Sequence, residues 1–134
     1  LIPIVNKSGA NFIAGPTLGA DPIVASVAAV SYLEKTPISA LIVRKEAKEH
    51  GSQKSVEGPI SKNLRVAVID DTCTTGKSLF HAIDVIESEG CEVVKVLSIM
   101  DRMSGGSEEC RKRGYDFQSL FVADQEGNIN IATT

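Results

Sequence analysis

The chain has 134 residues, which is enough for one compact domain with a single hydrophobic core, predicted here over residues 1–134. Its formal net charge of -3 argues against nonspecific binding of DNA or RNA, because such binding requires a basic surface. Its three cysteines form no CxxC pair and its apolar runs are too short to span a bilayer, so the sequence predicts a cytoplasmic domain with reduced thiols, no zinc site and no membrane partner.

Apolar runs alternate with helical patterns along the chain, which favours an α/β fold. The five predicted strands span residues 11–14, 38–43, 64–69, 92–100 and 117–122. Helices are predicted over residues 21–33, 77–89 and 107–113. We therefore expect a twisted, mostly parallel five-stranded sheet with helices on both faces. The polar tail after Ala123 is expected to fray.

The first strand is followed by a loop with two glycines, over residues 15–20. Asp21 and Pro22 then open a helix, because Asp is a good N-cap and proline fits the first helical turn. From the residues alone, the loop fits an ordinary turn as well as it fits a ligand-binding function.

A long polar stretch follows the second strand, and residues 45–62 are predicted to form a loop. Its first part is rich in charge, from Arg44 to Gly51. A charge run of this kind is usually a solvated face, although a loop this long in a compact domain is often functional.

The most informative segment spans residues 66–78, where an apolar strand ends in Asp70 and Asp71. A hydroxyl-rich loop follows, and Gly76 then stands at the start of a helix, where unpaired N–H groups suit a phosphate. The two carboxylates suit ribose hydroxyls, which donate hydrogen bonds to them. Residues 76–78 also match the end of a nucleotide-binding P-loop, but that motif requires a glycine where Asp71 stands.

This segment resembles the motif with which type I phosphoribosyltransferases bind phosphoribosyl pyrophosphate (PRPP). The polar stretch, with Gln53 and residues 57–59 downstream, resembles the mobile catalytic loop of orotate phosphoribosyltransferases. The resemblance implies an enzyme that transfers the phosphoribosyl group of PRPP to orotate, with Mg²⁺ as cofactor and no direct protein ligand to the metal. It also implies a homodimer in which the catalytic loop acts across the interface.

By the same resemblance, Asp70 and Asp71 hold the ribose hydroxyls, and Lys48 is the catalytic lysine. His50 would donate a hydrogen bond or a proton, and Arg102 would recognise the base. The residues expected to bind the 5-phosphate are Thr72, Thr74, Thr75, Gly76, Lys77 and Ser78, and those expected at the pyrophosphate are Arg44, Lys45, Thr17 and Gly19. His81 is predicted to be an ordinary surface residue of its helix.

The chain departs from the family pattern at several places. Gly19 stands where some members carry a lysine, and Lys77 replaces a small residue. The hood that covers the base in the family is expected to be short or missing, since residues 1–5 offer at most one of its strands. Two alternatives remain: a PRPP- or nucleotide-binding module without catalysis, and a phosphoribosyltransferase for another base.

Overall fold

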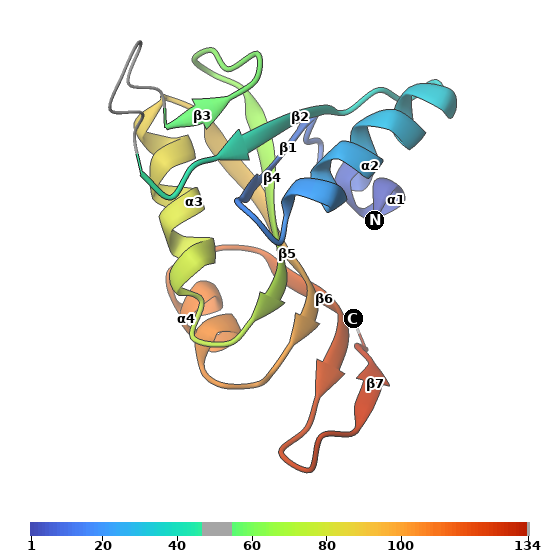
Figure 1. The fold of residues 1–134 in the computed structure, drawn as a ribbon, viewed down its shortest axis with the longest axis vertical. Helices are drawn as coiled ribbons and strands as arrows, with labels where there is room; N and C mark the ends of the chain where they lie inside the picture. The colour runs from blue at the N-terminus through green and yellow to red at the C-terminus, as the bar shows by residue number, and fades with distance from the viewer. Residues whose placement is uncertain (47–54, 134) are drawn as a thin grey trace.

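The computed structural model describes residues 1–46 and 55–133, so Lys48 and His50 lie outside the described residues. The strands are β1 (Phe12–Pro16), β2 (Ser39–Val43), β3 (Val56–Glu57), β4 (Arg65–Cys73), β5 (Glu92–Asp101), β6 (Phe117–Ala123) and β7 (Ile129–Ile131). The helices are α1 (Ile2–Lys7), α2 (Asp21–Leu33), α3 (Lys77–Ser88) and α4 (Gly106–Lys112). The strands form one sheet in the order β3-β2-β1-β4-β5-β6-β7 (Figure 1).

The predicted α/β class and the mostly parallel sheet are confirmed, but the predicted number of five strands is wrong. The five expected strands form the parallel centre, and one short antiparallel strand extends the sheet at each edge. At one edge, β3 pairs with β2 and buries Val56 within the stretch predicted to be a loop. At the other, β7 pairs with β6 within the tail predicted to fray. Asp124 closes that hairpin, because its carboxylate accepts hydrogen bonds from the N–H groups of Glu126 and Asn128.

The amino-terminal segment forms a helix rather than the strand that residues 1–5 were expected to offer. Pro3 lies in the first turn of α1, where a missing N–H leaves no hydrogen bond unmade. Val5 on this helix is fully buried in the same cluster as Ile13 and Val24. Packing against the sheet therefore determines the helical conformation of this segment.

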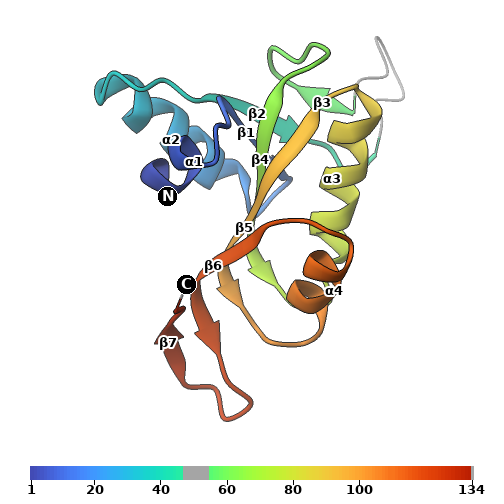
Figure 2. The ribbon, with the colours of Figure 1, turned by 180° about the vertical axis from the view of Figure 1, so that it is seen from behind.

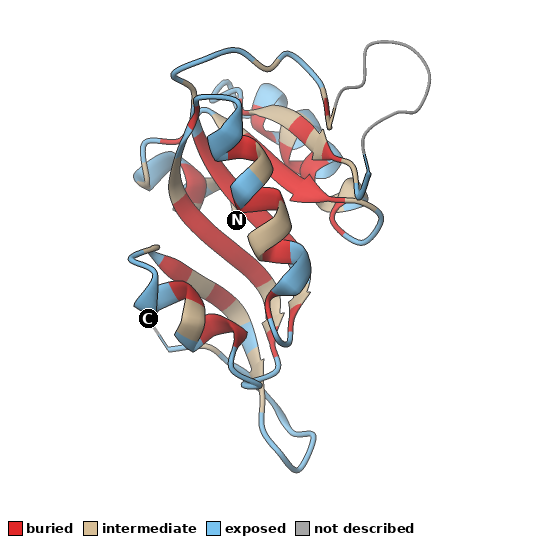
Figure 3. Ribbon diagram, turned by 90° about the vertical axis from the view of Figure 1, so that its left-hand side faces the viewer, coloured by how far each residue is buried: buried red, intermediate tan, exposed pale blue. Residues whose placement is uncertain are grey.

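Helices cover both faces of the sheet (Figure 2). On one face α1 and α2 pack against β1, β4 and β5, and on the other α3 and α4 pack against the same central strands and β6. The central strands are buried along most of their length (Figure 3). Within residues 1–46 and 55–133, none of the helices has the length and apolar character that a membrane crossing requires.

The strand order reverses between β1 and β4, since the chain runs from β1 to β2 on one side and from β4 to β5 on the other. β4 pairs with β1 only at residues 66–68, and its last residues extend past the end of this ladder. In open α/β sheets, ligands bind in the crevice at the carboxyl ends of strands flanking such a reversal. The topology therefore places the candidate site at the carboxyl end of β4.

Candidate functional site

The acid pair occupies the carboxyl-terminal half of β4. Asp70 is buried, with 7% of its surface exposed, whereas Asp71 is exposed. The Asp70 carboxylate accepts a hydrogen bond of 2.8 Å from the Asp71 N–H, and the Asp71 carboxylate accepts one of 2.8 Å from the Thr72 N–H. Burial raises the pKa of Asp70 to about 7, and the neighbouring Asp71 side chain adds to this rise. Asp70 can therefore both donate and accept hydrogen bonds at neutral pH.

The loop after the acid pair encloses a small cavity of about 120 Å³ at the start of α3. The lining residues are Asp70, Thr72, Thr74, Thr75, Gly76, Lys77, Ser78 and Leu79. Gly76 is the N-cap of α3 and has a φ of 85°, a conformation that favours glycine. The first N–H groups of a helix have no partner within the helix, so this cavity is suited to a phosphate.

The start of α4 packs against this loop and forms a hydrogen bond with its backbone. The Gly106 N–H donates a 3.0 Å hydrogen bond to the Thr74 carbonyl. A Cβ atom on Gly106 would lie 2.7 Å from both the Cys73 Sγ and the Gly76 backbone nitrogen, so only glycine fits there without displacing the loop. The shape of the phosphate loop thus depends on a residue thirty positions later in the chain.

The first glycine loop lies directly against the acid pair. A Cβ atom on Gly19 would lie 2.5 Å from an oxygen of the Asp71 carboxylate. Gly15, near the end of β1, allows a similarly close approach to β4, since its Cβ would lie 2.5 Å from the carbonyl oxygen of Ile69. The peptide bond between Thr17 and Leu18 is cis. The structure therefore brings the two predicted substrate-binding segments, far apart in sequence, into contact.

A second cavity, of about 360 Å³, lies beside the phosphate loop. It is lined by Pro16, Thr17, Lys45, Lys77, Ser78 and His81. Lys77 and Ser78 line both cavities, so the two spaces adjoin at the first turn of α3. Cations from two separate segments, Lys45 and Lys77, face one space here, and this arrangement suits a polyanion.

Arg44 is placed differently from the other predicted cations. Its guanidinium group forms an ion pair with Glu57, with an N–O distance of 2.7 Å. The backbone N–H of Arg44 donates a 2.8 Å hydrogen bond to the Ser55 carbonyl. Its carbonyl oxygen lies 2.8 Å from the Nε2 atom of His81. The predicted role of Arg44 in binding phosphate stays a prediction, and in this conformation its side chain stabilises the pairing of β2 with β3.

His81 is a half-buried residue that sequence reasoning took for an ordinary surface position. It lines the second cavity and contacts Arg44, 37 residues earlier. A contact of this range leaves no local signal in the sequence. The only hint was the position of His81 one helical turn after Lys77 and Ser78, on a helix whose start is predicted to bind phosphate.

Arg102 follows the end of β5 and is exposed. Its N–H donates a 2.9 Å hydrogen bond to the Cys73 carbonyl, which places it beside the phosphate loop. The adjacent Asp101 is buried, and its carboxylate accepts a hydrogen bond of 2.9 Å from the Met103 N–H. Asp101 is therefore engaged with the turn that carries Arg102, rather than exposed in a surface ion pair.

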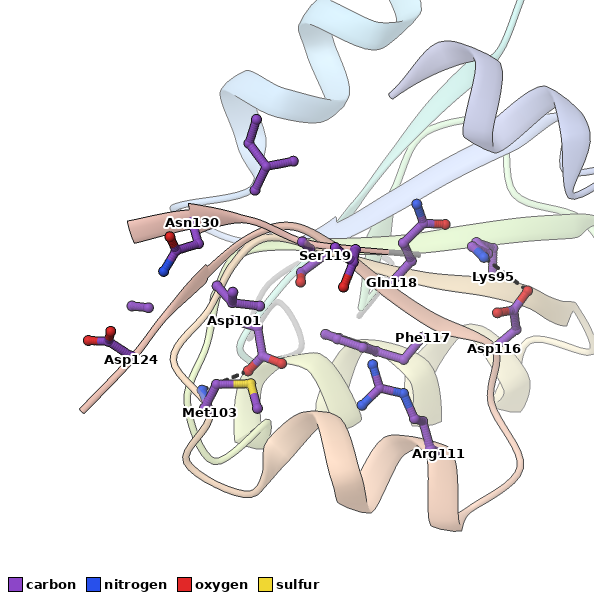
Figure 4. A pocket seen from close by; sticks show the side chains of 15 residues that line it. Lys95, Asp101, Met103, Arg111, Asp116, Phe117, Gln118, Ser119, Asp124 and Asn130 are labelled. Carbon is purple, nitrogen blue, oxygen red and sulfur yellow. Dashed lines mark hydrogen bonds and ion pairs between the residues drawn. The ribbon is translucent and has the colours of Figure 1, made fainter. Parts of the chain in front are cut away.

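A cavity larger than either of these two lies elsewhere, with a volume of about 910 Å³. It extends from the β6–β7 hairpin to Lys95 and Asp116, and Arg111 and Phe117 lie between α4 and the sheet (Figure 4). None of its lining residues belongs to the two cavities beside the acid pair. The candidate site is therefore identified by the acid pair and the phosphate loop, and not by the size of its cavities.

The cysteine in the phosphate loop is unsuited to nucleophilic chemistry. Burial raises the pKa of the Cys73 thiol to about 11, so the thiol stays protonated at neutral pH. Cys91 and Cys110 are also buried and free. Among the described residues, no cluster of three His, Cys, Asp or Glu side chains could hold a metal ion.

Comparison with known proteins identifies relatives of this chain. The phosphoribosyl transferase domain family matches residues 7–124. The orotate phosphoribosyltransferase of Synechocystis sp. is 46% identical over 111 residues, which cover 82% of this chain and 56% of that protein. That of Aquifex aeolicus is 40% identical over 118 residues, covering 88% of this chain and 64% of that protein. The chain thus spans between about half and two thirds of the length of these relatives.

Solved structures show the same similarity. The orotate phosphoribosyltransferase of Mycobacterium tuberculosis H37Rv, crystallised in complex with PRPP, superposes with a TM-score of 0.77 and 30% identity. The match covers 93% of this chain and 69% of that one. A phosphoribosyltransferase from Corynebacterium diphtheriae superposes with a TM-score of 0.78 and 32% identity, covering 93% of this chain and 70% of that one.

Proposed function

The chain belongs to the phosphoribosyl transferase family, and from this membership we propose that it transfers the phosphoribosyl group of PRPP to orotate. The products are orotidine 5′-monophosphate and pyrophosphate. The observation that carries the proposal is the acid pair of β4 followed by the phosphate-sized cavity at the start of α3. Relatives named orotate phosphoribosyltransferase, at 40 to 46% identity, support orotate as the acceptor.

In this proposal the two anionic ends of PRPP occupy the two adjoining cavities. The 5-phosphate binds in the smaller cavity, against the N–H groups and hydroxyls of residues 72–78. The ribose hydroxyls donate hydrogen bonds to Asp70 and Asp71. The pyrophosphate lies in the larger cavity with Lys45 and Lys77. Gly19 contributes only its backbone there.

The reaction breaks the bond between C1 of the ribose and the pyrophosphate oxygen and forms a bond from C1 to a ring nitrogen of orotate. Positive charge develops on the sugar, and negative charge develops on the leaving oxygens. The acidic pair stabilises the former, and Lys45 and Lys77 stabilise the latter. Lys48 and His50, which lie outside the described residues, are proposed to add a catalytic cation and a hydrogen-bond or proton donor.

The residues of this site fit a magnesium ion that is held through the substrate. Mg²⁺ prefers oxygen ligands and commonly binds through one or two carboxylates together with substrate phosphates. Asp70 and Asp71 lie beside the proposed ribose site and would act on the ion through the ribose hydroxyls that they bind, so neither is proposed as a direct ligand. The ion would neutralise the leaving group when bound.

Recognition of the base is assigned to Arg102, because a guanidinium group binds a carboxylate in a bidentate manner and orotate carries one. We also propose a homodimer in which the catalytic loop acts on the neighbouring subunit beyond Lys45, which itself lines the cavity of its own subunit, and a cytoplasmic location. The mass of the chain in solution, measured by light scattering, tests the dimer.

The function is tested by following orotate consumption through its ultraviolet absorbance, with PRPP and Mg²⁺. Loss of orotate that requires PRPP supports the proposal, and a panel of other bases tests the alternative acceptors. PRPP binding without turnover on any base would instead support a binding module. That candidate is kept because the chain spans only about half to two thirds of its relatives' length.

A further inference from the structure

A side chain of α3 contacts the backbone just after the end of β2. The Nε2 atom of His81 lies 2.8 Å from the carbonyl oxygen of Arg44. A carbonyl oxygen only accepts hydrogen bonds, so Nε2 carries the hydrogen and donates it. The pair is partly buried, which reduces competition from water for this bond.

Three contacts fix the backbone and side chain of Arg44, and they have different partners. Its N–H bonds to Ser55 and its guanidinium group bonds to Glu57, so both contacts join the end of β2 to the segment around β3. The contact with His81 joins it instead to the helix that begins at the phosphate loop. Figure 1 shows the chain leaving β2 beside α3.

This contact determines where the next residue lies. Lys45 follows Arg44 directly. It lines the cavity of about 360 Å³ together with Lys77, which lies one helical turn before His81. A rotation of the Arg44 peptide group would swing Lys45 relative to Lys77. Fixing that peptide group therefore fixes the spacing of two cations that belong to different segments.

We propose that His81 is a positioning residue, which anchors the Arg44 carbonyl so that Lys45 and Lys77 face the same polyanion. The proposal rests on the proposed function in assigning the pyrophosphate of PRPP to that cavity. His81 itself needs no charge for this role, because the neutral imidazole donates from Nε2.

Three variants of the full chain test the proposal. His81→Leu removes the donor and keeps an apolar side chain of similar size, whereas His81→Gln keeps an amide donor at a comparable reach. Asp84→Asn is the matched control, since Asp84 is exposed on the same helix. Two quantities are measured for each protein: the dissociation constant of PRPP with Mg²⁺ by calorimetry, and hydrogen exchange of the peptide covering residues 41–46 without ligand.

We expect His81→Leu to weaken PRPP binding by between about twofold and tenfold, the effect of one lost neutral hydrogen bond. Exchange in residues 41–46 should accelerate by a similar factor, with a melting temperature close to that of the wild type. His81→Gln should restore both quantities, and Asp84→Asn should change neither.

The inference is overturned if His81→Leu leaves the exchange of residues 41–46 unchanged, or if His81→Gln behaves like His81→Leu. Unchanged PRPP affinity in His81→Leu, with faster exchange, would also overturn it, because anchoring would then have no consequence for the ligand. A wild-type chain that does not bind PRPP would refute the proposed function instead. The exchange data would then decide the anchoring by themselves.

Discussion

Replacement of Gly106 by alanine should damage the phosphate loop from outside the site. The new Cβ atom would lie 2.7 Å from the Cys73 Sγ, 2.7 Å from the Gly76 nitrogen and 2.8 Å from the Thr74 oxygen. Two of these atoms are backbone, so α4 and the loop must separate. Such overpacking typically destabilises a core by about 1 to 3 kcal/mol. With an unfolding entropy of about 0.28 kcal/mol/K for 134 residues, the melting temperature should fall by about 4 to 11 °C.

Gly114→Ala is the control for this experiment. Gly114 has a φ of 91° and open space around it, so alanine there introduces backbone strain without a clash. A left-handed conformation costs a non-glycine residue about 1 to 2 kcal/mol, which corresponds to a fall of about 4 to 7 °C. Both variants should therefore melt earlier than the wild type.

Only Gly106→Ala should also lose affinity for PRPP, by about tenfold or more, since the displaced loop loses at least one hydrogen bond to a charged phosphate. Calorimetric titration with PRPP and a thermal melt of each variant supply the comparison. If Gly106→Ala melts early and still binds PRPP as tightly as the wild type, α4 does not shape the phosphate loop, and the reasoning is wrong.

Three further outcomes are expected. Lys48→Ala should abolish most orotate turnover while leaving the melting temperature unchanged, and unchanged turnover would remove Lys48 from the catalytic residues. Arg102→Ala should raise the KM for orotate by about tenfold to a hundredfold, which is the effect of losing a hydrogen bond to a charged group, and should leave the affinity for PRPP unchanged. Equal losses of affinity for both substrates would contradict the role of Arg102 in base recognition. Asp70→Asn should alter the pH dependence of stability. The folded pKa of Asp70 is about 7 against a reference value of 3.8, so the wild type loses stability as pH rises from about 4 to 7. The asparagine variant should not show this loss, so urea unfolding between pH 4 and pH 8 should give a flatter stability profile than that of the wild type; an equally steep decline in both proteins would show that Asp70 is not the source of the pH dependence.

The sequence predicted the centre of the sheet well because those strands are buried on both faces and contain unbroken apolar runs, as in residues 66–69. The loop at residues 72–76 was also predictable from the sequence. A strand, two acids and a glycine before a helix follow one another without interruption and form one contiguous motif. The edge strands were missed because their conformation comes from pairing. β3 has two residues, and all three residues of β7 are exposed, so neither carries a periodic pattern.

The contacts that complete the site escaped prediction for a related reason. Gly19 lies against Asp71 and Gly106 lies against Cys73, across 52 and 33 residues of sequence respectively. The role of each glycine becomes apparent only when its neighbour in space is known. What requires glycine there is the lack of room for a side chain, and the sequence does not show this. The same holds for His81, whose partner is a backbone carbonyl and leaves no side-chain pattern to detect.

Helix α3 connects these contacts. Its first residues, Lys77 and Ser78, line both cavities, and His81 one turn later holds the end of β2. α3 is one regular helix of twelve residues, and Leu79, Ala82, Ile83 and Ile86 form the buried stripe that packs it on the sheet. The spacing between the proposed 5-phosphate and pyrophosphate sites is therefore set by the packing of α3 on the sheet. It follows that a change in the core beneath α3 should disturb both ends of PRPP together, whereas a change in either loop should disturb one end alone.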